Sequence, residues 1–259
     1  MEQIKILVIG DSCTDVYVYG NCERLCPDAP VPVFVPCHII KSGGMAANVC
    51  ENLNALNLEC DVITNKKEIE KKRLVEKKTN HMIIRIDSSD EKVDKIKNIK
   101  EINLKKYAAI VISDYDKGFL DEDDIQYLCK NHPLTFMDTK KRLGEWCEEC
   151  TFIKINEVEF AKSKYFVDLY EEWIYDKLII TTGSEGCLHK GKKYPVKKVD
   201  VKDLSGAGDT FLAGLVCEYL RSGNIGSSII FANECATIVV QKKGVCTTDN
   251  ILKGKNNDH

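Results

Sequence analysis

The chain has 259 residues, of which 44% are hydrophobic, 37 are basic and 40 are acidic. This composition excludes an intrinsically disordered protein, and the near balance of charge excludes an overall field that would attract nucleic acid or an anionic membrane. No apolar run in the sequence approaches the roughly 20 residues that are needed to span a bilayer. The N-terminus leads into a strand rather than a signal peptide. We expect a cytoplasmic protein with no nucleic-acid or membrane partner.

The 13 cysteines are an odd number and are spread along the whole chain. A domain of this size does not need disulfides to fold, so we expect reduced thiols rather than a disulfide framework. Cys147 and Cys150 have the spacing of half a zinc site, which Cys22 and Cys26 could complete. We expect no zinc, because the second pair has a looser spacing and no histidine lies beside either pair.

Short runs rich in Ile and Val alternate with helical patterns along the chain. Buried strands are predicted at residues 4–9, 108–112, 134–137, 152–155 and 178–180. Apolar residues at helical spacing predict helices over residues 46–56 and 211–219, with Gly223 as the stop of the second. The lysine-rich run at residues 66–78, which has interleaved glutamates, is interpreted as a solvated helix face. The alternation indicates a three-layer α/β fold with a mostly parallel sheet flanked by helices.

Polar residues follow each predicted strand at the point where it ends. They are Asp11 with Asp15 after the first strand, then Ser113 with Asp114, Asp138, Asn156, and residues 181–183. The carboxyl ends of parallel strands lie at one edge of the sheet, so these groups should converge there. Each one alone is more often a helix cap or a turn former. Several together favour a site for a polyhydroxylated, phosphate-bearing ligand.

Residues 16–40 depart from the alternation, because their strand-like pattern is interrupted by four prolines. Such a segment suits an edge ribbon or a flap and not a central strand. Gly43 and Gly44 follow it and permit close backbone approach, and Asn48 lies one helical turn further on. We interpret the segment as a lid over a site that must be shielded from water.

The most informative segment for function is residues 203–211, which contains Gly206, Ala207, Gly208 and Asp209. The glycines allow backbone N–H groups to turn inward, and the following apolar helix directs its positive N-terminal end to the same point. Asp209 lies at the edge of this cradle, where it could take a proton from an attacking hydroxyl. The alternative is an ordinary glycine-containing turn with an N-capping aspartate.

These segments resemble carbohydrate kinases of the ribokinase, or phosphofructokinase B, family. The likeness runs almost end to end and includes residues 9–15, 27–33, 43–49, 85–87, 113–118, 138–140, 156–159, 182–186 and 205–209. Residues 43–49 and 205–209 are specific to the whole family. Residues 27–33 and 113–118 point to the subgroup that phosphorylates D-glycero-D-manno-heptose 7-phosphate at C1. The resemblance implies a single ribokinase-like kinase domain over residues 1–259, with a small β lid from residues 16–40 and about 80–88.

The resemblance also implies roles for individual residues. Asp209 would be the catalytic base, and Gly206, Ala207 and Gly208 would supply amides to the transferring phosphoryl group. The sugar-binding candidates are Asp11, Asp15, Gly43, Gly44, Asn48 and Asp114, with Arg24, Arg85 and Lys140 as candidates for the substrate's own phosphate. The cofactor-binding candidates are Asn156, Glu159, Thr182, Gly183, Gly186 and Asn233, with Glu159 ordering Mg²⁺ through water. The alternatives are a helix-capping pair for Asn156 and Glu159 and a helix-surface residue for Asn233.

The expected reaction transfers a phosphoryl group from Mg²⁺-ATP to a sugar phosphate, giving a second phosphate ester and ADP. Another sugar or sugar phosphate as acceptor, or a nucleotide- or sugar-binding protein without turnover, stays open as an alternative. Family members usually carry some tens of residues more before residue 78, so a helix and strands should be missing here. The chain leaves no room for the nucleotidyltransferase domain that is fused to some heptose kinases. The resemblance further implies a homodimer that pairs through the lid.

Overall fold

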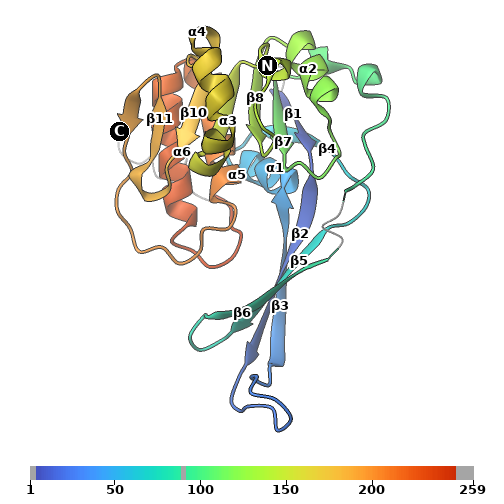
Figure 1. Ribbon diagram of the computed structural model, residues 1–259, viewed down its shortest axis with the longest axis vertical. Coiled ribbons are helices and arrows are strands. Elements are labelled where there is room, and N and C mark those ends of the chain that lie inside the picture. Colours follow the sequence, from blue (N-terminus) through green and yellow to red (C-terminus); the bar gives the residue numbers. More distant parts are fainter. Residues whose placement is uncertain (1–3, 89–91, 249–259) are drawn as a thin grey trace.

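The computed structural model describes residues 4–88 and 92–248. Its main sheet has eight strands in the order β12-β11-β10-β9-β8-β7-β1-β4 (Figure 1). The strands are β1 (Lys5–Gly10), β4 (Glu59–Thr64), β7 (Ala109–Asp114), β8 (Thr135–Thr139), β9 (Phe152–Asn156), β10 (Leu178–Thr181), β11 (Cys187–His189) and β12 (Lys192–Tyr194). The pairs from β4 through β10 are parallel, and β11 and β12 add an antiparallel edge. The five strands predicted from the sequence are therefore confirmed.

Helices cover both faces of this sheet, because successive side chains of each buried strand point to opposite sides. Ile6 and Val8 of β1 pack into a core with α1 (Ala46–Ala55), α5 (Ala207–Ser222) and α6 (Ile225–Val239). Leu7 and Ile9 face the other core. That core includes residues of α2 (Glu122–Asn131), α3 (Glu157–Leu169), α4 (Glu171–Ile174) and the short 3₁₀ turns η1 (Ile99–Glu101), η2 (Leu104–Lys106) and η3 (Glu145–Cys147). The predicted three-layer arrangement is confirmed.

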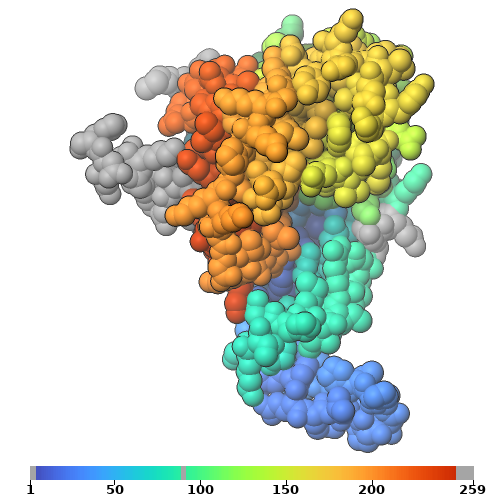
Figure 2. Space-filling model, turned by 60° about the vertical axis from the view of Figure 1, so that its left-hand side comes forward, coloured from blue at the N-terminus to red at the C-terminus, as the bar shows by residue number. Residues whose placement is uncertain are grey.

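A second sheet of four strands, in the order β3-β2-β5-β6, projects from the main body as an arm (Figures 1 and 2). Its strands are β2 (Ser12–Asn21), β3 (Val35–Met45), β5 (Glu70–Glu76) and β6 (Met82–Ser88). Residues 70–76 form the strand β5, so the interpretation of residues 66–78 as a helix face is wrong. Its Lys and Glu residues flank Leu74 and Val75 in a strand that pairs with both β2 and β6. We call this second sheet the lid.

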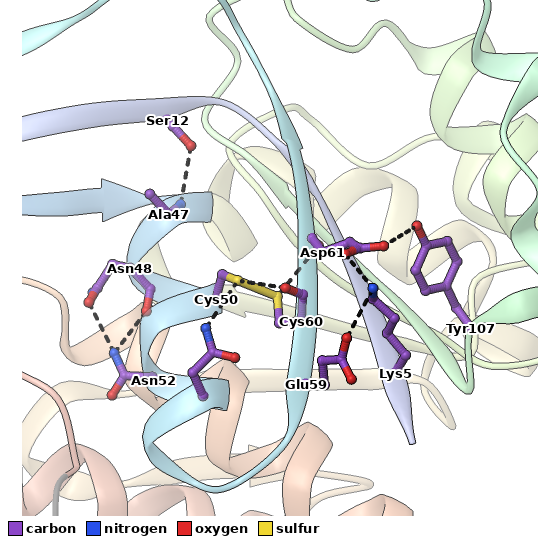
Figure 3. Close-up of a disulfide and its surroundings, with 11 residues drawn as sticks. Lys5, Ser12, Ala47, Asn48, Cys50, Asn52, Glu59, Cys60, Asp61 and Tyr107 are labelled. Atoms are coloured by element: carbon purple, nitrogen blue, oxygen red, sulfur yellow. Dashed lines mark hydrogen bonds and ion pairs between the residues drawn. A yellow bond between two sulfur atoms is a disulfide. The ribbon is translucent and has the colours of Figure 1, made fainter. Parts of the chain in front are cut away.

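Cys50 of α1 and Cys60 of β4 form a disulfide (Figure 3). The expectation that all the thiols are reduced is therefore wrong for this pair. The two cysteines are only ten positions apart in the sequence, and the packing of α1 beside β4 brings their Cα atoms to 5.8 Å. Cys147 and Cys150 are buried in a hydrophobic core, whereas Cys22 and Cys26 lie in the segment that joins β2 to β3. Among residues 4–88 and 92–248, no helix is long and apolar enough to cross a membrane.

Candidate active site

Asp209 is buried in the first turn of α5, and each of its carboxylate oxygens accepts one hydrogen bond from a side chain. Asn48 Nδ2 donates to Oδ2 over 2.9 Å, and the Tyr115 hydroxyl donates to Oδ1 over 2.7 Å. Burial raises the pKa of Asp209 to about 6, and these two hydrogen bonds oppose that rise. A carboxylate with this pKa is ionised near neutral pH and can still accept a proton.

The helix α1 fixes the direction in which the Asn48 amide points (Figure 3). Asn52, one turn further on, donates its Nδ2 to the Asn48 side-chain oxygen over 3.0 Å and to the Asn48 backbone oxygen over 2.9 Å. Thr210 donates to Asn52 Oδ1 over 3.3 Å. Because the Asn48 oxygen is occupied, its NH₂ group is the end that faces Asp209.

The cradle before α5 needs glycine for two different reasons. Gly206 has a φ of 80°, a left-handed conformation that favours glycine, and a Cβ atom there would lie 2.7 Å from Asn48 Nδ2. A Cβ atom on Gly208 would lie 3.0 Å from Lys154 Nζ. Asp203 stabilises the turn that leads into the cradle, because its Oδ1 accepts a hydrogen bond from the Ser205 N–H over 2.8 Å. The Ala207 N–H donates to the Leu204 carbonyl over 3.2 Å, and the N-terminal end of α5 is the part of this helix that an anion would approach.

A cleft of about 1040 Å³ opens beside the cradle. Gly206, Ala207 and Gly208 line it together with Asp138, Asn156, Gly183, Gly186 and Asn233. Thr182, which precedes the 3₁₀ turn η4 (Gly183–Glu185), is not among the lining residues, although its neighbour Thr181 is. Asn233 is buried in α6 and donates to the Tyr194 carbonyl over 3.0 Å, so it is not a helix-surface residue. The structure thus brings the predicted ends of β8, β9 and β10 and the cradle to one cleft.

Two lysines carry positive charge into this cleft. Lys154 Nζ lies 2.5 Å from Asp138 Oδ2, and both side chains are buried. Lys140 Nζ lies 2.5 Å from Glu159 Oε1 and 3.4 Å from Asp138 Oδ1. Burial alone would raise the pKa of Asp138, but the two lysines hold it below its usual value. The pKa of Asp138 is thus lowered and the pKa of Asp209 is raised, so Asp209 is the carboxylate suited to proton transfer.

Asn156 and Glu159 form the capping box of α3. Asn156 Oδ1 accepts from the Glu159 N–H over 2.9 Å, and Glu159 Oε2 accepts from the Asn156 N–H over 2.7 Å. The capping alternative that the sequence left open is thus present in the structure. Both groups nevertheless lie at the end of β9, and Asn156 lines the cleft. Because both Glu159 oxygens have protein partners, a cation beside this pair would be held through water.

Asp15, Gly43 and Gly44 lie where the lid joins the main domain. Gly44 pairs with Cys13, and a Cβ atom on it would collide with the Asp15 carboxylate. Asp15 forms a buried ion pair with Arg73 of β5 at 2.5 Å. Two lid strands therefore fix the position of the Asp15 carboxylate.

Four of the predicted substrate-binding residues lie apart from this arrangement. Asp11 accepts hydrogen bonds from the backbone N–H groups of residues 115, 117 and 119. Asp114 accepts from Thr139 and pairs with Lys141 at 2.7 Å. Arg24 is exposed in the segment between β2 and β3, and Arg85 of β6 pairs with Asp87 at 2.6 Å. Both aspartates have protein partners that support the loop after β7.

Sequence reasoning missed three residues of the site, namely Tyr115, Lys154 and Arg73. Tyr115 lies inside the segment 113–118, which carried the family likeness, but its role depends on a partner far along the chain. Lys154 had a local indication, because a lysine inside the apolar strand β9 needs a buried partner. Arg73 lies in the lysine-rich run whose composition fits a helix face, so the sequence carries no signal for its pairing with Asp15.

Comparison with known proteins identifies the family to which this chain is similar. A family model described as pfkB family carbohydrate kinase matches residues 51–251. The bifunctional protein HldE of a Nitratiruptor species is 30% identical over 293 aligned residues, which cover 94% of this chain and 63% of that protein. HldE of Helicobacter pylori (strain J99) is also 30% identical, over 93% of this chain and 63% of that protein. The chain thus spans less than two thirds of these relatives' length.

Solved structures show the same fold. Ribokinase from Thermotoga maritima has a TM-score of 0.69 at 16% identity, covering 93% of this chain and 94% of its own. Ribokinase from Arabidopsis thaliana, solved with ribose and ATP, has a TM-score of 0.68 at 12% identity, covering 97% of this chain and 98% of its own. The architecture of this chain is that of ribokinase.

Proposed function

This chain belongs to the pfkB family of carbohydrate kinases, and from that premise we propose that it transfers the γ-phosphoryl group of ATP to a hydroxyl of a sugar phosphate. The main observation behind this proposal is that Asp209 lies in the first turn of a helix whose N-terminus lines a cleft. Asp209 is buried and held by Asn48 and Tyr115, and residues 206–208 line the adjoining cleft. A base and an anion site side by side are what phosphoryl transfer to a hydroxyl requires.

In the proposed reaction Asp209 accepts the proton of the acceptor hydroxyl while that oxygen forms a bond to the γ-phosphorus. The bond between the γ-phosphorus and the β,γ-bridging oxygen breaks, and ADP leaves. The cradle and the Lys154 ammonium group beside Gly208 would face the negative charge of the transferring phosphoryl group. Mg²⁺ would neutralise phosphate charge when bound, and the Asn156–Glu159 pair fits it as a partner through water.

We propose D-glycero-D-manno-heptose 7-phosphate as the acceptor, phosphorylated at C1 to the 1,7-bisphosphate. Two observations support this substrate: the likeness of residues 27–33 and 113–118 to the heptose subgroup, and the similarity to HldE proteins over 94% of the chain. Lys140 is the strongest candidate for the existing phosphate, since it is half-buried at the end of β8. Arg24 and Arg85 are exposed on the lid and would reach the substrate only with the lid closed over it.

The first experiment measures ADP release with heptose 7-phosphate, with the unphosphorylated heptose and with a panel of other sugars and sugar phosphates. We expect the highest kcat/KM for heptose 7-phosphate. Equal efficiency with the unphosphorylated heptose would contradict the substrate assignment, and preference for another sugar phosphate would replace it. Absence of turnover with every acceptor would leave a protein that only binds its ligands.

A variant then tests the base. Asp209→Asn should fold and bind ATP but lose roughly two or more orders of magnitude in kcat, the usual contribution of a positioned base. Asp176→Asn is the matched control, because Asp176 is exposed and pairs with Lys190 on the surface. Turnover of Asp209→Asn near the wild-type rate would show that the mechanism is wrong.

A further inference from the structure

Tyr115 connects the catalytic carboxylate to the two structural units around it. It follows the last residue of β7, and its backbone N–H donates to Asp11 Oδ2 over 2.7 Å. Its hydroxyl donates to Asp209 Oδ1 over 2.7 Å. Two ammonium groups lie over its ring: Lys71 Nζ of the lid at 5.6 Å and Lys140 Nζ at 5.2 Å from the centroid.

We propose that Tyr115 is a positioning residue for the reaction, whose hydroxyl holds the Asp209 carboxylate in the orientation that accepts the proton of the sugar hydroxyl. The inference rests on the proposed kinase function. With Asn48 on Oδ2 and Tyr115 on Oδ1, both carboxylate oxygens are tied, so the plane of the group is fixed. Each oxygen keeps acceptor capacity for the sugar hydroxyl.

The phenol serves as a donor throughout the reaction and never as the base. Burial, followed by the negative charges of Asp209 and Asp138, raises the pKa of Tyr115 well above its usual value. Tyr115 therefore keeps its proton at any pH at which the enzyme works. Because its hydrogen bond is worth more to a charged acceptor than to a neutral one, it favours the ionised form of Asp209.

The ring also gives the lid a contact that reaches the base. Lys71 is half-buried on β5, and its pairing partner across the strands is Asp15. Its ammonium group over the ring is attracted to the π-face, and Lys140 makes the same kind of contact from the end of β8. Lysine from the lid and lysine from the main sheet thus hold one aromatic ring whose hydroxyl touches Asp209.

Tyr115→Phe removes the hydroxyl and keeps the ring, so it tests the hydrogen bond alone. We expect kcat to fall about tenfold or more, by the usual value of a hydrogen bond to a charged group, while the KM for ATP stays within about twofold. The acid limb of the kcat profile should move to higher pH by roughly one unit, because the ionised form of Asp209 loses a donor. Tyr107→Phe is the matched control, since Tyr107 also donates to a carboxylate, Asp61 at 2.9 Å, away from the site.

A measurement that does not depend on turnover completes the test. The pKa of the Asp209 carboxyl can be followed by carbon NMR in the wild type, in Tyr115→Phe and in Tyr107→Phe. Asp138 of β8, Lys154 of β9 and Cys13 of β2 also act on Asp209, and none of them changes in these variants. A raised pKa in Tyr115→Phe alone supports the proposal.

Two outcomes would overturn it. An unmoved acid limb and an unmoved carboxyl pKa in Tyr115→Phe would show that the hydroxyl does not act on Asp209, even if the variant is less active through a structural defect. Wild-type kcat in Tyr115→Phe would do the same. Failure of the proposed function looks different, because the wild type would then release no ADP with any acceptor while the carboxyl pKa could still respond to Tyr115.

Discussion

At the scale of single residues, the burial that suits Asp209 to its proposed role as the base also has a cost in stability. Burial raises its pKa from 3.8 to about 6, so ionising it in the folded protein is harder than in the unfolded chain. A carboxyl group whose pKa is raised on folding does not change the free energy of unfolding at pH values below its pKa in the unfolded chain. It lowers the free energy of unfolding progressively as the pH rises from about 4 to about 6. Above that range the penalty is constant.

Asp209→Asn should therefore be more stable than the wild type at pH 8, and the difference should shrink on going towards pH 4. A shift of this size corresponds to at most about 3 kcal/mol, and loss of the carboxylate's hydrogen bonds with Asn48 and Tyr115 will reduce it. Urea unfolding of both proteins at several pH values measures the difference. A difference in stability that stays the same between pH 4 and pH 8 would show that burial does not raise the pKa of Asp209 in this way.

At the scale of elements, the N-terminus of α5 is sensitive to side-chain volume. A valine at position 208 would press on Lys154, whose Nζ already lies 3.0 Å from the place of a Cβ atom, and would cover the cradle amides. We expect Gly208→Val to weaken ATP binding at least tenfold, or about 1.4 kcal/mol, measured by calorimetry. Gly223→Ala, at the other end of the same helix, should cost roughly 1 kcal/mol of stability and leave ATP affinity unchanged. Equal ATP affinity for Gly208→Val and the wild type would show that the cradle is not part of the nucleotide site.

The sequence predicted the elements of the main sheet because their information is local. Buried parallel strands are short apolar runs, and residues 206–209 combine the turn, the helix start and the proposed base in four neighbouring positions. β5 was missed because lysine and glutamate fit a helix face as well as a strand, and its apolar partners come from other strands. Contacts between side chains that are far apart in the sequence could not be predicted for the same reason. Tyr115 is 94 residues from Asp209, and Arg73 is 58 residues from Asp15.

At the scale of the whole molecule, the lid has one face that the main domain does not cover. On its inner face Tyr17, Tyr19 and Val75 pack against Val245. On the other face the strand register places Ile39, Leu74 and Ile84 in one row across the sheet, beside Val18. Ile39 and Ile84 remain 59% and 50% exposed, and Ile86 in the next row is 42% exposed. An arm of four strands with an apolar outer face has little core of its own.

We propose that a second copy of the chain covers this face and that the protein is a homodimer paired through its lids. Light scattering at micromolar concentration should then give twice the chain mass. Ile84→Glu should give a monomer, because it places a charge in the apolar row. Tyr165→Glu is the control, since Tyr165 is 82% exposed on α3 and lies on the main domain. A wild-type monomer with and without nucleotide and sugar phosphate would rule out the dimer.

Closure of the lid over the site is tested separately by hydrogen exchange. Unchanged hydrogen exchange in residues 16–40 on adding ligands would rule out this closure.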